Sequence, residues 1–199
     1  MAKGKSDLIL RDRMQFTFDA TGNRTTLYGR IDLSDYVNTV DKKGLSIKEV
    51  RFQIRDPDGL ETNTGVWTPV GQSANASGAN AARASLKLYA TTRAYENASD
   101  VGISSPDVIA VHEQIQIIPP QLAANADDPT YTFLWNDYGT PDLHPEGFTV
   151  VSDLLIGIAA DGWTEYANQT LEVDCMLIAE PVSVTVARMN EILTQAQDL

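Results

Sequence analysis

The chain has 199 residues, one cysteine and a net charge of −12, and these values limit the classes of protein it can belong to. A chain of this length most simply forms one all-β domain, which buries roughly 70% of its unfolded surface without a disulfide or a structural metal. The acidic body repels phosphate backbones, so we expect no nucleic-acid binding by the domain itself. Cys175 alternates with Val173 and Leu177, which predicts a small buried apolar residue.

Residues 1–13 are predicted to form an N-terminal arm. This arm holds four of the fifteen basic residues of the chain, and these are Lys3, Lys5, Arg11 and Arg13. Such a charge can contact lipid headgroups, polyphosphate or another protein, although basic residues in a frayed terminus are as common by chance. Its only apolar run, residues 8–10, is too short for a secretory signal or a membrane span, so we expect folding in a cytoplasm.

The first predicted element after the arm is a β-hairpin. Apolar and polar residues alternate across residues 13–19, which indicates a strand with one buried and one exposed face. Residues 24–33 repeat this pattern, and Gly22 and Asn23 between them accept the positive φ of a tight turn. We therefore expect the two strands to pair with each other.

The next predicted strand covers residues 46–55 and ends at an Asp-Pro-Asp-Gly turn, residues 56–59. Oxygen-bearing side chains spaced by two from Asp56 to Glu61 also resemble a flexible calcium loop. The twelfth position of such a loop needs a bidentate glutamate, and Trp67 stands there. A plain turn is therefore the favoured interpretation, and calcium binding is left open.

A long Gly-, Asn- and Ser-rich loop is predicted over residues 60–84, followed by strands near 86–90, 108–118 and 131–135. The strand 108–118 has an apolar row of isoleucine and valine opposite a polar row that contains His112. We expect the apolar row to face the core and His112 to lie on a solvated face.

Two later strands, 148–159 and 171–179, are apolar on both faces, which is typical of central strands. We expect their second face to be covered by the C-terminal helix or by another subunit. That helix is predicted from about residue 184 to 197, because apolar residues recur at three- and four-residue spacing. The apolar stripe consists of Val186, Met189, Ile192, Leu193 and Ala196. The stripe either packs on its own sandwich or docks on a neighbouring copy, since its polar face lacks the cations of a lipid-binding helix.

The sequence contains no residue set that predicts a reaction, and we expect a protein that is not an enzyme. The two histidines, His112 and His144, belong to no nucleophile–base motif, and neither zinc-ligand spacing nor a glycine-rich phosphate loop occurs. No catalytic, metal-binding or cofactor-binding residue is assigned, and no cofactor is expected. The acids Asp153, Glu172 and Asp174 lie opposite the main apolar rows, where a surface or interface role is expected.

The strand pattern, the long loops and the terminal helix resemble the single jelly-roll major capsid proteins of icosahedral viruses over about residues 12–180. The small size and the acidic body are more similar to the capsomer subunits of membrane-containing prokaryotic viruses than to shells that grip genomes with arginine-rich arms. The resemblance implies an all-β fold, an eight-stranded antiparallel jelly-roll sandwich over residues 14–180. The arm 1–13 precedes it, and residues 181–199 supply an amphipathic C-terminal helix.

The same resemblance implies a structural virion protein, made in the host cytoplasm, that forms trimeric to hexameric capsomers. The helical stripe would form the assembly interface, and the arm would face an internal membrane or a second coat protein. Two alternatives stay open, a tube or decoration subunit of a phage-like particle and a carbohydrate-binding jelly-roll module. The second alternative would use Trp67 and Trp163 as a stacking surface for sugars, whereas packing of these rings in a core or interface is favoured.

Overall fold

A computed structural model of the protein describes residues 7–59, 63–68, 82–118, 132–138 and 147–195. These residues form nine strands, one α-helix and two one-turn 3₁₀ helices. The strands are β1 (Leu8–Thr17), β2 (Arg24–Ile31), β3 (Lys43–Arg55), β4 (Ala82–Thr91), β5 (Val108–Ile118), β6 (Thr132–Tyr138), β7 (Phe148–Val150), β8 (Leu154–Asp161) and β9 (Thr170–Ser183). The helical elements are η1 (Ala98–Asp100), η3 (Thr164–Tyr166) and α1 (Val186–Gln195).

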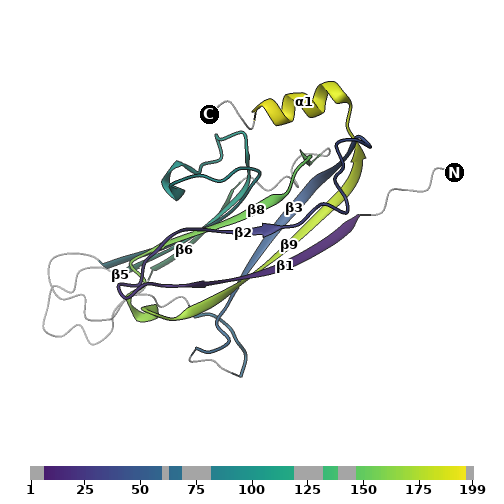
Figure 1. Cartoon of the computed structure of the whole chain (residues 1–199). Coiled ribbons are helices and arrows are strands. Elements are labelled where there is room, and N and C mark those ends of the chain that lie inside the picture. Colours follow the sequence, from purple (N-terminus) through teal and green to yellow (C-terminus); the bar gives the residue numbers. More distant parts are fainter. Residues whose placement is uncertain (1–6, 60–62, 69–81, 119–131, 139–146, 196–199) are drawn as a thin grey trace, which may run out of the picture.

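The strands form two antiparallel sheets that pack face to face (Figure 1). The four-stranded sheet has the order β1-β9-β3-β7, and the five-stranded sheet has the order β2-β8-β4-β5-β6. This arrangement confirms the predicted all-β sandwich and the C-terminal helix. The strand number is corrected from eight to nine in the described part of the chain.

The core fills the space between the inner faces of the two sheets. Alternate residues of β9 point into it, so Val173 and Leu177 are fully buried and Cys175 is only 4% exposed. The prediction that Cys175 is a buried apolar residue is confirmed. Burial disfavours the thiolate and raises the pKa of the Cys175 thiol to about 12.

The first predicted turn forms, but the predicted hairpin is wrong. Gly22 has a φ of 76°, and the Asp19 carboxylate accepts hydrogen bonds from the backbone N–H groups of Thr21 and Asn23 at 2.8 and 2.9 Å. The strands on either side separate, because β1 pairs with β9 while β2 pairs with β8. The same chain reversal can join neighbouring strands or cross between layers, and the turn residues do not distinguish the two.

Beyond Ile109, which lies in the core as predicted, strand β5 turns its polar row toward the core, opposite to the prediction. Its register pairs Gln114 with Leu86 and Gln116 with Ala84, and paired residues of neighbouring strands share a face. Gln114 is 4% exposed and Gln116 is fully buried, whereas Ile115 is on the outward face and only partly buried. Alternation specifies two faces, but the register with β4 decides which face lies inside.

The chain covers the middle of the outward face of the five-stranded sheet with its own segment 92–107. Tyr89 of β4 and Val101 of this segment are buried in one cluster. The Tyr89 ring lies across Gly157 of β8, where a Cβ would come within 2.1 Å of a ring carbon. The second face of β8 was predicted to need the C-terminal helix or another subunit as cover. That prediction is wrong around Gly157, because segment 92–107 covers this face.

Candidate functional site

Helix α1 is the first predicted assembly element, and it lies at one end of the sandwich (Figure 1). Thr185 caps its N-terminus, since the Thr185 hydroxyl accepts a hydrogen bond from the backbone N–H of Arg188 at 3.2 Å. Met189 is 5% exposed and packs in a cluster with Val151 and Val184. The helix is thus held to its own sandwich through part of its apolar stripe.

The rest of the predicted stripe divides between buried and exposed positions. Ile192 is partly buried against the Met189 cluster, whereas Val186 is 53% exposed and Leu193 is 38% exposed. Ala196 lies outside the described residues. A hollow of about 730 Å³ lies between the helix and the end of the sandwich, and Leu193 and Val182 contribute to its wall. The helix therefore leaves apolar side chains available to a neighbour.

The predicted N-terminal arm is shorter than the sequence indicates. Strand β1 begins at Leu8, so Arg11 and Arg13 belong to a paired strand of the four-stranded sheet. Both side chains point outward. Every second residue of β1 pairs with a residue of the buried row of β9, and the two arginines are the residues in between. Lys3 and Lys5 lie outside the described residues. The boundary between arm and sandwich is corrected from residue 14 to residue 8.

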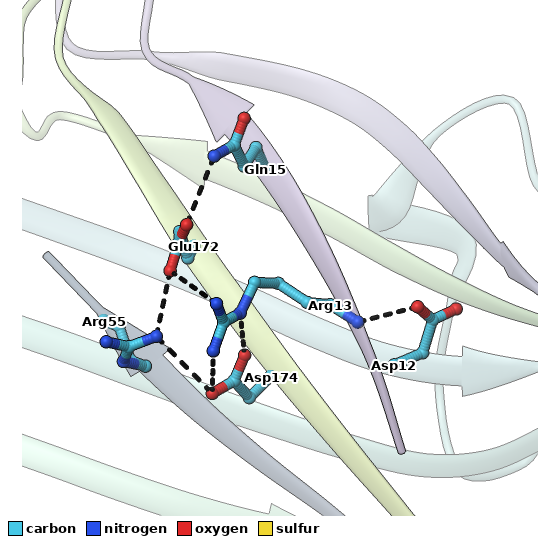
Figure 2. A network of polar contacts seen from close by, with 6 residues as sticks. All are labelled: Asp12, Arg13, Gln15, Arg55, Glu172 and Asp174. Carbon is cyan, nitrogen blue, oxygen red and sulfur yellow. Dashed lines mark hydrogen bonds and ion pairs between the residues drawn. The ribbon is translucent and has the colours of Figure 1, made fainter. Parts of the chain in front are cut away.

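Arg13 takes part in a network of ion pairs across three strands on this outward face (Figure 2). Its Nε donates to the Asp174 carboxylate at 2.5 Å, and its Nη1 lies 3.5 Å from the Glu172 carboxylate. Arg55 of β3 donates to Glu172 at 3.1 Å, and Gln15 of β1 donates to its other oxygen at 3.2 Å. The hydrogen bond from Arg13 keeps the pKa of Asp174 below its ordinary value.

The consequence of this network is that Arg13 and Arg55 on the outward face are matched to acids of the same chain. Arg13, predicted to face a membrane or partner, already binds two carboxylates. Glu172 and Asp174, expected at a surface or interface, lie on this face, and the pairs join β1, β9 and β3. Asp153 accepts a hydrogen bond from Arg30 beside β8. Each of these three acids therefore has a cationic partner within the chain.

Trp67 and Trp163 are buried, which removes the predicted sugar-stacking surface. They are 6% and 0% exposed, and their ring centroids lie 5.1 Å apart. The indole N–H of Trp163 donates to the Ser85 carbonyl at 2.7 Å. Both rings are parts of the core, so these two tryptophans do not form the exposed stacking surface for sugars that the carbohydrate-binding alternative expected.

Strand β6 carries the largest group of exposed apolar side chains on one described element. It is the edge strand of the five-stranded sheet, and four of its seven residues are exposed and apolar or aromatic. They are Phe133 (38%), Leu134 (44%), Trp135 (56%) and Tyr138 (39%). Successive residues of a strand point to opposite faces, so β6 exposes apolar surface on both of its faces. The sequence pattern predicts a strand near residues 131–135 but does not predict its exposure.

His112 anchors β6 to its neighbour and is not the solvated residue that was predicted. Its Nδ1 is hydrogen-bonded to the Asp137 carboxylate of β6, and its Nε2 is 3.1 Å from the Gln114 amide nitrogen. The Trp135 ring packs edge-on against the imidazole, with ring centroids 5.9 Å apart. The second histidine, His144, lies outside the described residues.

The turn after β3 forms as predicted. The backbone N–H of Gly59 donates to the Asp56 carbonyl at 3.4 Å, and the Asp56 side chain is buried. Glu61 lies outside the described residues. Within the described ranges, no group of three or more His, Cys, Asp or Glu residues is placed to hold a metal ion.

Comparison with protein families and with curated sequences gives no match for this chain. No protein-family model matches it, and no curated protein matches its sequence. None of the helices in the described part of the chain is long and apolar enough to span a bilayer. The functional conclusion therefore depends on the geometry of the chain alone.

Proposed function

We propose that this protein is a structural subunit that assembles with copies of itself, of the kind represented by the major capsid proteins with one jelly roll. The observation that carries the proposal is the apolar surface of β6, which is exposed on both faces of an edge strand. A soluble monomer seldom leaves such a strand open, because it exposes both apolar side chains and unpaired backbone groups. The exposed residues of α1 add a second apolar surface at another place on the molecule.

The order in which the strands pair supports a jelly roll. When β6 is set aside, the first strand pairs with the last, and the pairs then nest inward. These pairs are β1 with β9, β2 with β8, β3 with β7 and β4 with β5. A long hairpin of eight strands that rolls into two sheets has this nesting, which is the double Greek-key arrangement of jelly rolls. Strand β6 is then an addition to the edge of one sheet.

In this role each contact between subunits can be weak, because closure of a ring or shell multiplies it. The expected state is a trimeric to hexameric capsomer within a virion, made in a host cytoplasm. A second coat protein and an internal membrane are further proposed partners, with residues 1–7 on the membrane side. A tube or decoration subunit is the alternative role, and it uses the same exposed surfaces.

Light scattering and negative-stain microscopy of the purified chain test this proposal. The net charge of −12 makes subunits repel one another at low salt, and the screening length falls from about 10 Å at 0.1 M to about 3 Å at 1 M salt. We therefore expect rings or particles that become more abundant as the salt concentration rises. A chain that stays monomeric at high protein concentration and at high salt would disprove self-assembly.

A further inference from the structure

We propose that β6 pairs antiparallel with β6 of a second copy across a two-fold axis, which joins two five-stranded sheets into one continuous sheet. This inference rests on the proposed assembly function and names one of its contacts. It requires that β6 is the open edge of the sandwich, that a copy of the same strand fits it, and that charge does not oppose the contact.

The other three sheet edges in the described residues carry features that oppose pairing with another chain. Strand β1 has Arg11, Asp12 and Arg13 in succession, and β7 is only three residues long. Strand β2 carries two arginines, and its register with β8 shifts between Arg24 and Leu27. Charged residues, short edges and bulges are the usual protections of edge strands. Strand β6 has no lysine, arginine or proline, so it is the unprotected edge.

A second copy matches this edge in length and in side-chain character. The middle residue of the seven in β6 is Trp135, and a two-fold axis there pairs all seven residues of each strand. Trp135 then lies opposite its counterpart, and Phe133 lies diagonally beside Trp135 of the second copy. On the other face Leu134 lies opposite Asn136 of the second copy. Aromatic side chains thus gather at the centre of the contact, where burial stabilises it most.

Charge also favours a second copy over a foreign basic strand. Asp137 is the one charged residue of β6, and its carboxylate is already bound to His112. A basic partner therefore finds no free acid on this strand. In the two-fold pairing the two Asp137 residues lie four positions apart along the strand, about 14 Å, which exceeds the screening length of about 8 Å at physiological salt. The acids of the two copies consequently repel each other little.

The contact is small, which fits a role inside a larger assembly. Seven paired residues cover less than the about 800 Å² per partner of a standard interface. Pairing of backbone N–H and C=O groups still fixes the register and the direction of the two chains. The β6 contact thus sets geometry, and additional contacts through α1 or other surfaces supply the remaining affinity.

Disulfide trapping in the full-length chain tests this pairing. Residues directly opposite in antiparallel strands have Cα atoms about 4.5 to 5.5 Å apart, which lies within the range that a disulfide spans. Trp135→Cys should therefore give a covalent dimer under mild oxidation, seen on a non-reducing gel. The native Cys175 is 4% exposed and provides no competing thiol in the folded chain. Unchanged protein is the background sample.

Tyr138→Cys is the matched control on the same strand. In the proposed register its counterpart lies six positions away on the paired strand, about 20 Å, beyond the reach of a disulfide. We expect this variant to stay at the background level of dimer. The double variant Thr132→Cys and Tyr138→Cys keeps Trp135 and places each cysteine opposite its partner in the second copy, so it should form covalent dimers again.

The outcomes separate this inference from the proposed function. Absence of dimer in both the Trp135→Cys and the double variant, or equal dimer in Tyr138→Cys, overturns the two-fold pairing and leaves β6 to another partner or register. Particles without these cross-links would retain the capsid role and reject the β6 contact. Cross-linked dimers without particles would retain the contact and reject the capsid role.

Discussion

Two regions of the five-stranded sheet have apolar side chains on the same outward face but are treated differently by the chain. Around Tyr89 the sheet is covered by segment 92–107, and Lys87 of β4 holds this segment by donating to the carbonyls of Ala98 and Val101 at 3.1 and 2.5 Å. Around β6 the outward residues Leu134 and Tyr138 stay 44% and 39% exposed. The same sheet thus has one region that the chain itself covers, around Tyr89, and one exposed region, around β6.

The two regions differ in how many contacts the chain makes with its own outward face. Gly157 lets the rings of Tyr28 and Tyr89 meet edge to face at 5.8 Å, and the Tyr89 hydroxyl donates to the Tyr28 hydroxyl at 2.9 Å. Burial of this hydroxyl raises the pKa of Tyr89 far above its ordinary value. No comparable set of contacts covers the outward face of β6 within the described residues. The covered region around Tyr89 should therefore determine the stability of the folded chain, and the exposed region around β6 should determine association between copies.

The largest expected effect is the loss of stability in Tyr89→Ala. Removing a fully buried aromatic ring costs about 3 to 5 kcal/mol of the free energy of unfolding, and here the hydroxyl bond to Tyr28 is lost as well. Leu134→Ala, on the same outward face, should change the free energy of unfolding by less than about 0.5 kcal/mol. Urea unfolding of the dissociated chains measures both. Similar losses in the two variants would contradict the distinction between the regions.

The sequence predicts the β-rich character of the molecule because alternation of period two is a local property. It also predicts the buried row of β9 and its central position. The predicted central strand 148–159 is only partly right, because it divides into β7, an edge strand of the four-stranded sheet, and β8, a central strand of the five-stranded sheet. The pairing of β1 with β9 joins residues at opposite ends of the chain. Long-range pairing of this kind depends on the whole topology, so the local turn at Gly22 misled the prediction of a hairpin.

The candidate surfaces were harder to predict for a related reason. The residues of α1 fall on an apolar stripe, yet only the packing of Met189 on Val151 shows which of them stay exposed. For β6, consecutive apolar residues Phe133, Leu134 and Trp135 are a pattern that also fits a buried strand. In the structure both faces of β6 are exposed, and this exposure follows from the tertiary arrangement alone.

Helix α1 carries both buried and exposed apolar residues, so the same comparison can be made within one element. Met189→Ala should lower the free energy of unfolding by about 2 to 3 kcal/mol, since it opens a cavity beside Val151 and Val184. Leu193→Gln changes a residue that is 38% exposed and should leave unfolding within about 0.5 kcal/mol. Light scattering should show fewer particles for Leu193→Gln. Unfolding transitions that reverse this order would show that the helix docks in another way.

The smallest expected effect concerns the outward face of the four-stranded sheet. On this face ion pairs connect the strands, and no segment like 92–107 packs over them within the described residues. The pKa of Asp174 is lowered from 3.8 by the hydrogen bond from Arg13, so the carboxylate stabilises the folded state above that pH. As the pH falls through the lowered pKa, this stabilisation is lost. Asp174→Asn should cost about 0.5 to 1 kcal/mol at pH 7, because the pair is partly exposed.

Urea unfolding of wild type and Asp174→Asn from pH 7 to pH 2 measures this contribution. The difference between the two proteins should be constant down to about pH 4, where a free aspartate titrates, and should shrink below it. Asp35→Asn, at an exposed acid, is the control and should leave the free energy of unfolding at pH 7 within about 0.5 kcal/mol. A difference for Asp174→Asn that persists at pH 2 would mean that the amide disturbs the packing of β9, and that the ion pair to Arg13 contributes little to the stability of this face.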